Sequence, residues 1–548
     1  MKKIILFIAV LLYIHRVSGQ TSLDSSNLPI VIINTNGQGI NQGVKTPSSM
    51  RIIYNGSGSF NHVTDVPNNY NNNIGIEVRG QSSTGFDQLQ YNIETRDSAQ
   101  AKKDTIVLGM PTHADWVLYA PYTDKSLMRN VITYQLALDM GHWAARTKFC
   151  EVIIDGDYKG VYVFMEKIKR DKNRVNIKKL LPTSNSADSI TGGYIFSIDK
   201  DQPDFYSTIA PNNATSGQNI GFTFKYPTAA NISTPQAEYL KHYVLDSFEN
   251  TLNSPNFMDP VNGYRKYVSI KSFIDFMLIN EVSKNVDGYR LSSYFYKDRY
   301  SNGGLLKAGP VWDFNLAWHN ADYCAGELSS GWAYKFNDVC GGDNWVIPFW
   351  WDKMMTDTVY QNKLYCRWQE LRGTLLNTTV LFGKIDSMTL LLNDAQARHF
   401  VRYPILGTYV WPNPSPLANT YAEEILATKN WIVDRLAWLD ANILPNGTCA
   451  PPVVTGIGNS NKINYSNVYP NPFTDKVSVT VTIPTNDVYT TELYSIMGQK
   501  LAVLSTINYT SDEYTLVYNL GTANYKAGMY YLKISSSSSS QTIKVVKQ

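Results

Sequence analysis

Two aspartates and one arginine stand where their side chains could take part in phosphoryl transfer. Asp287 follows a predicted helix in a loop that leads to a predicted strand, and Asp313 follows Trp312 at the end of another predicted strand. Arg79 and Gly80 lie in a loop between two predicted strands, where the backbone could approach a phosphate. Phosphoryl transfer needs cations on the phosphates, a carboxylate for Mg²⁺ and a carboxylate that orients the hydroxyl nucleophile. These residue types meet those needs in part.

The same residues also have a purely structural interpretation. Asp287 and Asp313 could cap turns, and Arg79 could pair with a carboxylate such as Glu166. Glu166, at the end of a predicted strand, could instead orient a phosphate-binding cation. Residue type alone leaves both interpretations open.

Hydrophobic periodicity places these residues on an α+β framework. In the first half, apolar residues at helical spacing predict a helix over 126–140, and β-type runs joined by Asp155-Gly156-Asp157 predict a hairpin over 151–166. Further strands are expected at 28–34 and on both sides of the loop 79–83. The second half is more helical, with helices expected at 234–252, 270–285, 359–377, 381–400 and 419–441, and strands at 291–297 and 308–312.

The composition changes at the end of this body. Residues 451–464 are rich in Pro, Gly, Ser and Asn and read as a linker. Beyond them, short alternating runs follow one another, as in VSVTVTI and MYYLKI. This spacing predicts a small all-β sandwich over 465–548. The body is expected to extend over 20–450.

The first 19 residues have the order of a secretory signal peptide. Lys2 and Lys3 precede an apolar run of 11 residues, Ile4 to Ile14, and a cut after Gly19 would leave Gln20 as the new N-terminus. The run is shorter than the roughly 20 residues that a membrane-spanning helix needs. We therefore expect an exported chain with no transmembrane segment once the signal is removed.

Charge and cysteine content narrow the function classes. The net charge is +3, from 49 basic and 46 acidic residues, which argues against a dedicated nucleic-acid-binding protein. Five cysteines in an exported chain allow disulfides. Cys324 and Cys340 are close in sequence and are predicted to form a local disulfide, whereas the pairing of Cys150, Cys366 and Cys449 stays open.

The C-terminal part resembles the sorting domain of type IX secretion cargo. The resemblance rests on YPNPF at 469–473, LY at 493–494 with MGQ at 497–499, KAGMYYL at 526–532 and IKVV at 543–546. It implies a β-sandwich that the type IX secretion machinery recognises, and hence a protein that passes through the periplasm and is secreted or held at the outer cell surface.

The body resembles the CotH kinase family of secreted atypical kinases. The motifs, in order, are IEVRGQSS at 76–83, DWVL at 115–118 with DKSLMRN at 124–130, the segment 152–166, EVSKNVDGYRLSSYFYKD at 281–298 and GPVWDFN at 309–315. The resemblance implies a reduced protein-kinase-like fold that transfers the γ-phosphate of ATP to serines of secreted or surface proteins. It assigns a base-like role to Asp287 and binding of Mg²⁺ or Mn²⁺ to Asp313. We assign nucleotide contacts to Arg79, Gly80, Glu166 and Trp312.

The sequence departs from the family where a lysine pair is expected after the RG-x-SS loop. Gln88 and Leu89 stand there and cannot supply a positive charge, and Asn315 replaces a second aspartate. Lys125 and Lys167 are candidate substitutes.

The alternative function is therefore a degenerate kinase that serves as a protein- or glycan-binding surface module. Its tryptophans could contribute a platform for such a ligand, although core packing is the commoner role of this residue: Trp312, Trp318, Trp332, Trp345, Trp350 and Trp351.

Overall fold

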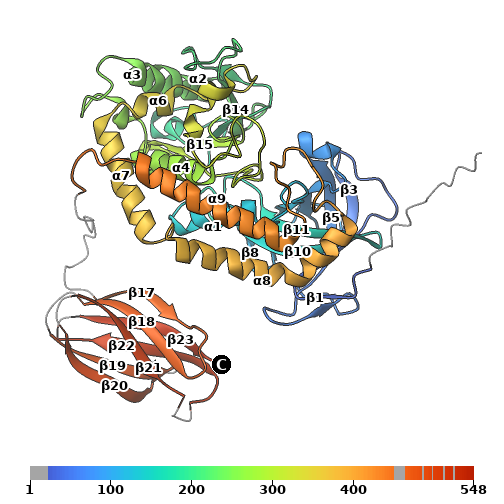
Figure 1. The fold of residues 1–548 in the computed structure, drawn as a ribbon, viewed down its shortest axis with the longest axis vertical. Coiled ribbons are helices and arrows are strands. Elements are labelled where there is room, and N and C mark those ends of the chain that lie inside the picture. The colour runs from blue at the N-terminus through green and yellow to red at the C-terminus, as the bar shows by residue number, and fades with distance from the viewer. Residues whose placement is uncertain are drawn as a thin grey trace, which may run out of the picture. The chain divides into compact units, whose positions relative to one another are not determined.

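The computed structural model describes residues 22–449 and, with short gaps, 463–548; residues 484–486, 497, 510–511, 522–524 and 538 are not described. The predicted signal peptide, 1–19, and nearly all of the predicted linker lie outside the described residues. The chain forms two compact units, Met1–Cys449 and Ala450–Gln548, and each is described by itself (Figure 1).

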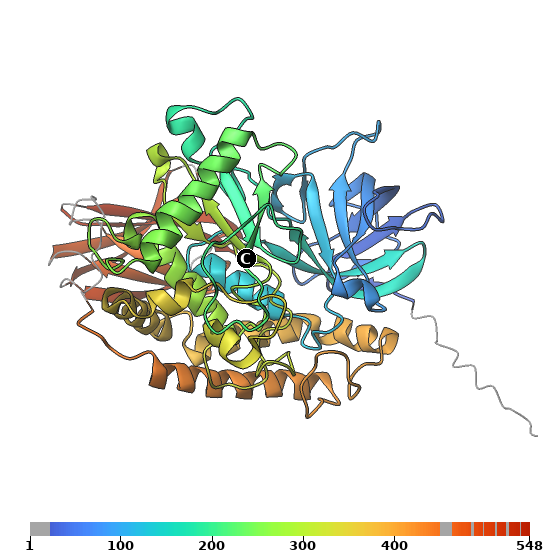
Figure 2. The ribbon, with the colours of Figure 1, turned by 90° about the horizontal axis from the view of Figure 1, so that it is seen from above.

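A closed β-barrel forms the N-terminal part of the body (Figure 2). Its strand order is β10-β11-β9-β6-β5-β3-β2, and β10 closes the barrel by pairing in parallel with β2. Alternating apolar side chains fill the interior, among them Ile76, Ile93 and Phe164. The strands are β2 (Ile30–Asn34), β3 (Thr46–Ile53), β5 (Tyr70–Arg79), β6 (Gln90–Thr95), β9 (Asp115–Tyr119), β10 (Thr147–Ile154) and β11 (Asp157–Glu166).

A five-stranded sheet and several helices form the rest of the body's core. The sheet order is β13-β14-β12-β15-β16. Aromatic rings in edge-to-face and tilted contacts pack between this sheet and the helices, including Phe295, Trp350 and Trp351. The elements are β12 (Tyr194–Ile198), β13 (Phe205–Tyr206), β14 (Gly221–Tyr226), β15 (Ser293–Lys297), β16 (Leu306–Ala308), α1 (Arg129–Asp139), α4 (Ile270–Ser283), α5 (Phe336–Cys340) and α6 (Trp350–Met354).

Long helices complete the body. Helix α8 (Thr378–Arg402) reaches the barrel, where the Nδ1 atom of His399 accepts a hydrogen bond from the Val161 N–H at 3.1 Å (Figure 1). Helix α9 (Tyr421–Asn442) contributes Arg435, which forms a buried ion pair with Glu281 of α4 at 3.0 Å. The remaining helices are α7 (Thr358–Gly373), α2 (Thr234–His242) and α3 (Asn250–Asn253), the last two joined by a π-helical segment over 243–249. In the described part of the chain, no helix by itself has the length and apolarity to cross a bilayer, although α7 and α8 taken as one bent pair do.

The tail is an all-β sandwich. One sheet has the order β17-β18-β21 and the other β20-β19-β22-β23. Side chains between the sheets form a separate core that includes Val479, Leu493 and Ile543. The strands are β17 (Asn464–Tyr469), β18 (Lys476–Ile483), β19 (Asp487–Ser495), β20 (Lys500–Tyr509), β21 (Asp512–Asn519), β22 (Gly528–Ser535) and β23 (Ser540–Lys547). The predicted fold class, an α+β body followed by a small β-sandwich, is confirmed.

Local differences from the predicted elements have physical reasons. The strand expected at 308–312 is wrong, because β16 ends at Ala308 and Pro310 has no N–H to continue a ladder. Helix α1 begins at Arg129 rather than Ser126, because the Ser126 backbone N–H and hydroxyl bond to the Asp124 carboxylate in a turn.

The cysteine pairs follow the prediction and extend it. The Cys324–Cys340 disulfide is confirmed, with its Cα atoms 5.6 Å apart. A second disulfide joins Cys366 of α7 to Cys449, and Cys150 is free and buried in the barrel. The odd cysteine is therefore Cys150.

Candidate active site

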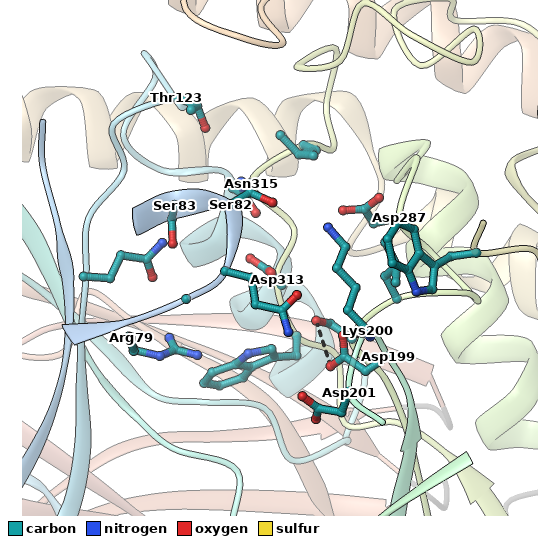
Figure 3. A pocket seen from close by; sticks show the side chains of 18 of the residues that line it. Arg79, Ser82, Ser83, Thr123, Asp199, Lys200, Asp201, Asp287, Asp313 and Asn315 are labelled. Carbon is teal, nitrogen blue, oxygen red and sulfur yellow. Dashed lines mark hydrogen bonds between the residues drawn. The ribbon is translucent and has the colours of Figure 1, made fainter. Parts of the chain in front are cut away.

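One polar cavity of about 800 Å³ collects the chemistry-bearing residues of the body (Figure 3). Arg79 and Gly80 come from the end of β5, Asp287 from the loop between α4 and β15, and Asp313 from the segment after β16. Figure 3 shows Arg79 and Ser83 on one side of the cavity, Asp199 and Asp287 on the other, and Asp313 between them. The other polar residues that line it include Gln42, Glu77, Gln81, Ser82, Gln90, Asn92, Thr123, Lys167, Lys200, Asp201, Lys225, Arg290, Ser292, Asn315 and Asp343.

Two neighbouring cations on the barrel side carry no ion pair within the described part of the chain. The Arg79 guanidinium lies over the Trp312 ring, 5.6 Å from its centroid. Lys167, directly after β11, donates only to the Asn92 Oδ1 atom at 3.3 Å. Burial lowers the pKa of Lys167 to about 8, and the positive charges of Arg79 and Lys169 lower it further. Two unneutralised cations at one wall favour a polyanion such as a chain of phosphates.

Carboxylates face these cations across the cavity. The Asp313 side chain is exposed to the cavity, but the surrounding protein displaces water around it. This desolvation and the negative charge of Asp287 raise the pKa of Asp313 to about 6, although the positive charge of Arg79 lowers it. Its backbone has φ of 61°, a left-handed conformation that non-glycine residues adopt rarely and mostly at functional sites. Burial also raises the pKa of Asp199, which follows β12.

Helix α1 holds the Asp313 segment in place. The Asp313 N–H donates to the Tyr134 hydroxyl at 3.0 Å, and the next N–H, of Phe314, donates to Asn130 Oδ1 at 2.6 Å. Trp312 stacks on the Tyr134 ring at 6.0 Å between centroids. These contacts fix a segment that has no strand partner after Ala308, so the carboxylate of Asp313 has a defined position.

Asp287 is held from two sides. Arg290, almost fully buried, donates to the Asp287 Oδ1 atom at 2.9 Å, and the Tyr323 hydroxyl lies 3.4 Å from the same oxygen. Helix α4 ends at Ser283, and Lys284 adopts a left-handed conformation that turns the chain toward the cavity. The second oxygen of Asp287 is thus left for a ligand in the cavity.

The structure brings together five of the six site residues expected from the sequence. Arg79, Gly80, Trp312, Asp287 and Asp313 all line the cavity. Glu166 does not line it. Its buried carboxylate pairs with Arg146 at 2.7 Å and lies 3.5 Å from Arg174, so the pairing with Arg79 considered above does not form either.

The positions of the missing lysine pair also lie off the cavity. Gln88 is 1% exposed, and its amide donates to the carbonyl oxygens of Lys159 and Val161. Lys125 is buried and donates to the Thr408 carbonyl at 2.6 Å, away from the cavity lining. Of the two candidate substitutes, only Lys167 reaches the site.

Sequence reasoning missed several lining residues. Asp199, Lys200 and Asp201 directly follow the buried strand β12, and no role in phosphoryl transfer was predicted for them. Their position at a strand end was the available signal. Arg290 and Trp411 carried no such signal, because their role depends on contacts between segments that are distant in the sequence.

The residues fit a nucleotide with a divalent cation. Mg²⁺ keeps several water ligands and typically takes one or two carboxylates plus phosphate oxygens. Within the described residues, no group of three or more His, Cys, Asp or Glu side chains is placed to hold a metal, so a protein-only metal cage is absent there. Asp313, with Asn315 two residues further on, would supply the protein ligands, and the phosphates would complete the shell.

The body thus joins a closed barrel to a part made of a five-stranded sheet and helices, and cations face carboxylates in one cavity. The chain matches the CotH kinase protein family over residues 76–439 and therefore belongs to that family. Residues 467–548 match the secretion system C-terminal sorting domain, which marks the chain for export by type IX secretion to the cell surface or beyond. A search of curated proteins found no match.

Proposed function

We propose that the body is an exported atypical protein kinase that uses ATP with Mg²⁺ or Mn²⁺ to phosphorylate serines of secreted or surface proteins. The observation that carries the proposal is the pair of unneutralised cations, Arg79 and Lys167, facing Asp287 and Asp313 in one cavity. Family membership supports ATP-dependent kinase chemistry with a divalent metal in general.

Each residue has a distinct role in this proposal. Arg79 and Lys167 bind the phosphates and neutralise charge that develops on the transferred group. Asp313 and Asn315 would hold a divalent cation, which would supply positive charge to the phosphates. Asp287, fixed by Arg290, accepts a hydrogen bond from the serine hydroxyl and takes its proton as the bond between the serine oxygen and the γ-phosphorus forms and the bond between the γ-phosphorus and the ADP oxygen breaks, with ADP leaving.

A second candidate is a binding module without turnover, and two exposed tryptophans favour it. Trp345 is 37% exposed and Trp411 46% exposed at the cavity, and Trp411 stacks on Tyr323 with 5.9 Å between ring centroids. Such a rim suits a protein or glycan ligand. The other tryptophans considered for this role, such as Trp318, Trp350 and Trp351, lie in the core.

Calorimetry of the mature chain with ATP, with and without Mg²⁺ or Mn²⁺, tests the proposal. We expect metal-dependent binding that Asp313→Ala abolishes, while Asp171→Ala, a change outside the cavity lining, preserves it. Absence of binding at millimolar ATP would refute the kinase proposal and leave the binding module. Binding without phosphate transfer to any secreted protein of the source cell would also favour the second candidate.

A further inference from the structure

The disulfide-closed segment 324–340 lies against the residues that hold Asp287. Tyr323, next to Cys324, donates to the Asp287 carboxylate at 3.4 Å. Phe336, inside the segment, supports the Arg290 guanidinium, whose carbon lies 3.9 Å from the ring centroid. The residue before the segment thus contacts Asp287 directly, and the interior of the segment contacts Arg290, which pairs with Asp287.

The residues after Cys340 complete the support of Arg290. Arg290 donates to the Asp343 carboxylate at 3.3 Å and to the Trp345 carbonyl at 3.0 Å. The buried guanidinium of Arg290 therefore links Asp287 to the segment that follows Cys340. Displacing Asp343 and Trp345 would remove two of the acceptors that fix the orientation of Arg290.

The first residues of the segment have strained backbone conformations. Cys324 and Ala325 have φ of 52° and 56°, left-handed conformations that are unfavourable for side chains with a Cβ atom. The middle is anchored separately, because the buried Glu281 carboxylate accepts hydrogen bonds from the N–H groups of Ala333 and Tyr334. Opening the disulfide should release Tyr323 and Asp343 without unfolding the body.

We propose that the Cys324–Cys340 disulfide, acting through Tyr323 and Arg290, positions Asp287, so that the site becomes competent for phosphoryl transfer only in an oxidising compartment. This inference rests on the proposed function of Asp287. A dithiol reductant would supply two electrons and two protons, converting the cystine to two thiols while itself becoming a disulfide. The reverse reaction, with an oxidised dithiol–disulfide donor, would complete the site after export from the reducing cytoplasm.

The test compares two double variants of the mature chain: Cys324→Ser with Cys340→Ser, and Cys366→Ser with Cys449→Ser as the matched control. Hydrogen–deuterium exchange of a peptide covering 284–292 reports the Asp287 loop without any substrate. Two backbone bonds in this peptide, from Gly288 to Asn285 and from Leu291 to Asp287, are expected to open more often. We expect exchange there to be about tenfold faster in the first variant and unchanged in the control.

Two functional quantities are measured. The first is the rate of ADP release from Mg–ATP with water as the phosphate acceptor, and the second is the affinity for ATP by calorimetry. The first variant should lose about 100-fold in kcat, as small misplacements of catalytic groups do, with ATP affinity within about twofold of the original. Equal exchange at 284–292 in both variants would overturn the proposal. If the original chain binds no ATP, the proposed kinase function fails, yet the exchange comparison still decides whether the disulfide positions Asp287.

Point variants test the two positioning residues. Tyr323→Phe removes one hydroxyl, and Arg290→Lys keeps the charge but loses the fork that joins Asp287 to Asp343. Both should lower kcat at unchanged KM for ATP, and Arg290→Gln should lower it more than Arg290→Lys. A change in KM with kcat intact would overturn the positioning role.

Discussion

Replacing Lys167 with Gln tests the assignment of the phosphate-binding wall most directly. The change keeps a polar side chain that can still meet Asn92, but it removes one of the two unneutralised cations beside the cavity. A hydrogen bond between charged groups typically contributes about 1.5–3 kcal/mol. Loss of one such bond to a phosphate corresponds to about a 10- to 150-fold weaker affinity for Mg–ATP.

Lys169→Gln is the matched control for this change. Lys169 lies two residues further along the chain and pairs with Asp115 at 3.6 Å, outside the cavity lining. The assay is isothermal calorimetry of the mature chain with Mg–ATP at pH 7. An affinity within twofold of the original chain for Lys167→Gln, or an equal loss for Lys169→Gln, would refute the assignment.

Three further predictions follow from the same structure. Because Lys167 is charged below its pKa of about 8, affinity for Mg–ATP should fall as the pH rises above 8, and calorimetric titrations in Lys167→Gln should lack this fall. Asn130→Ala leaves the N–H after Asp313 without its acceptor and should weaken metal-dependent ATP binding by about tenfold, with metal-free binding as the control. Arg435→Met leaves the buried Glu281 carboxylate unpaired and should lower the free energy of unfolding by about 3–5 kcal/mol in chemical denaturation; an effect below 1 kcal/mol would contradict this account.

Local patterns predicted the elements of the body because apolar periodicity is a property of neighbouring residues. The hairpin around Asp155-Gly156 and the loop after Arg79 lie where the sequence places them. The strand expected up to Trp312 failed because Pro310 interrupts it, although the proline is visible in the sequence. Strands β17 and β20 were not predicted, since their runs alternate weakly between apolar and polar residues.

Which residues reach the site depends on contacts between residues that are far apart in the sequence. Lys125 and Lys167 are equivalent candidates in the sequence, and only the fold separates them, because Lys125 bonds to the carbonyl of Thr408. Glu166 stands at a strand end as expected, but Arg146 neutralises it outside the cavity. Asp287 and Asp313 could be assigned early because each belongs to an ordered set of motifs rather than to an isolated residue type.

The Cys366–Cys449 disulfide has a mechanical consequence for a chain whose C-terminal unit is handled by secretion machinery. The bond joins Cys449, the last described residue of the body, to Cys366 in helix α7, and the two cysteines are 83 positions apart in the sequence. The loop that the bond closes contains α8 and α9. Tension applied to the tail enters the body at Cys449 and passes through the sulfur atoms into α7. The enclosed helices are therefore shielded from pulling force, and unravelling under tension at the tail would have to begin at α7 while this bond is intact.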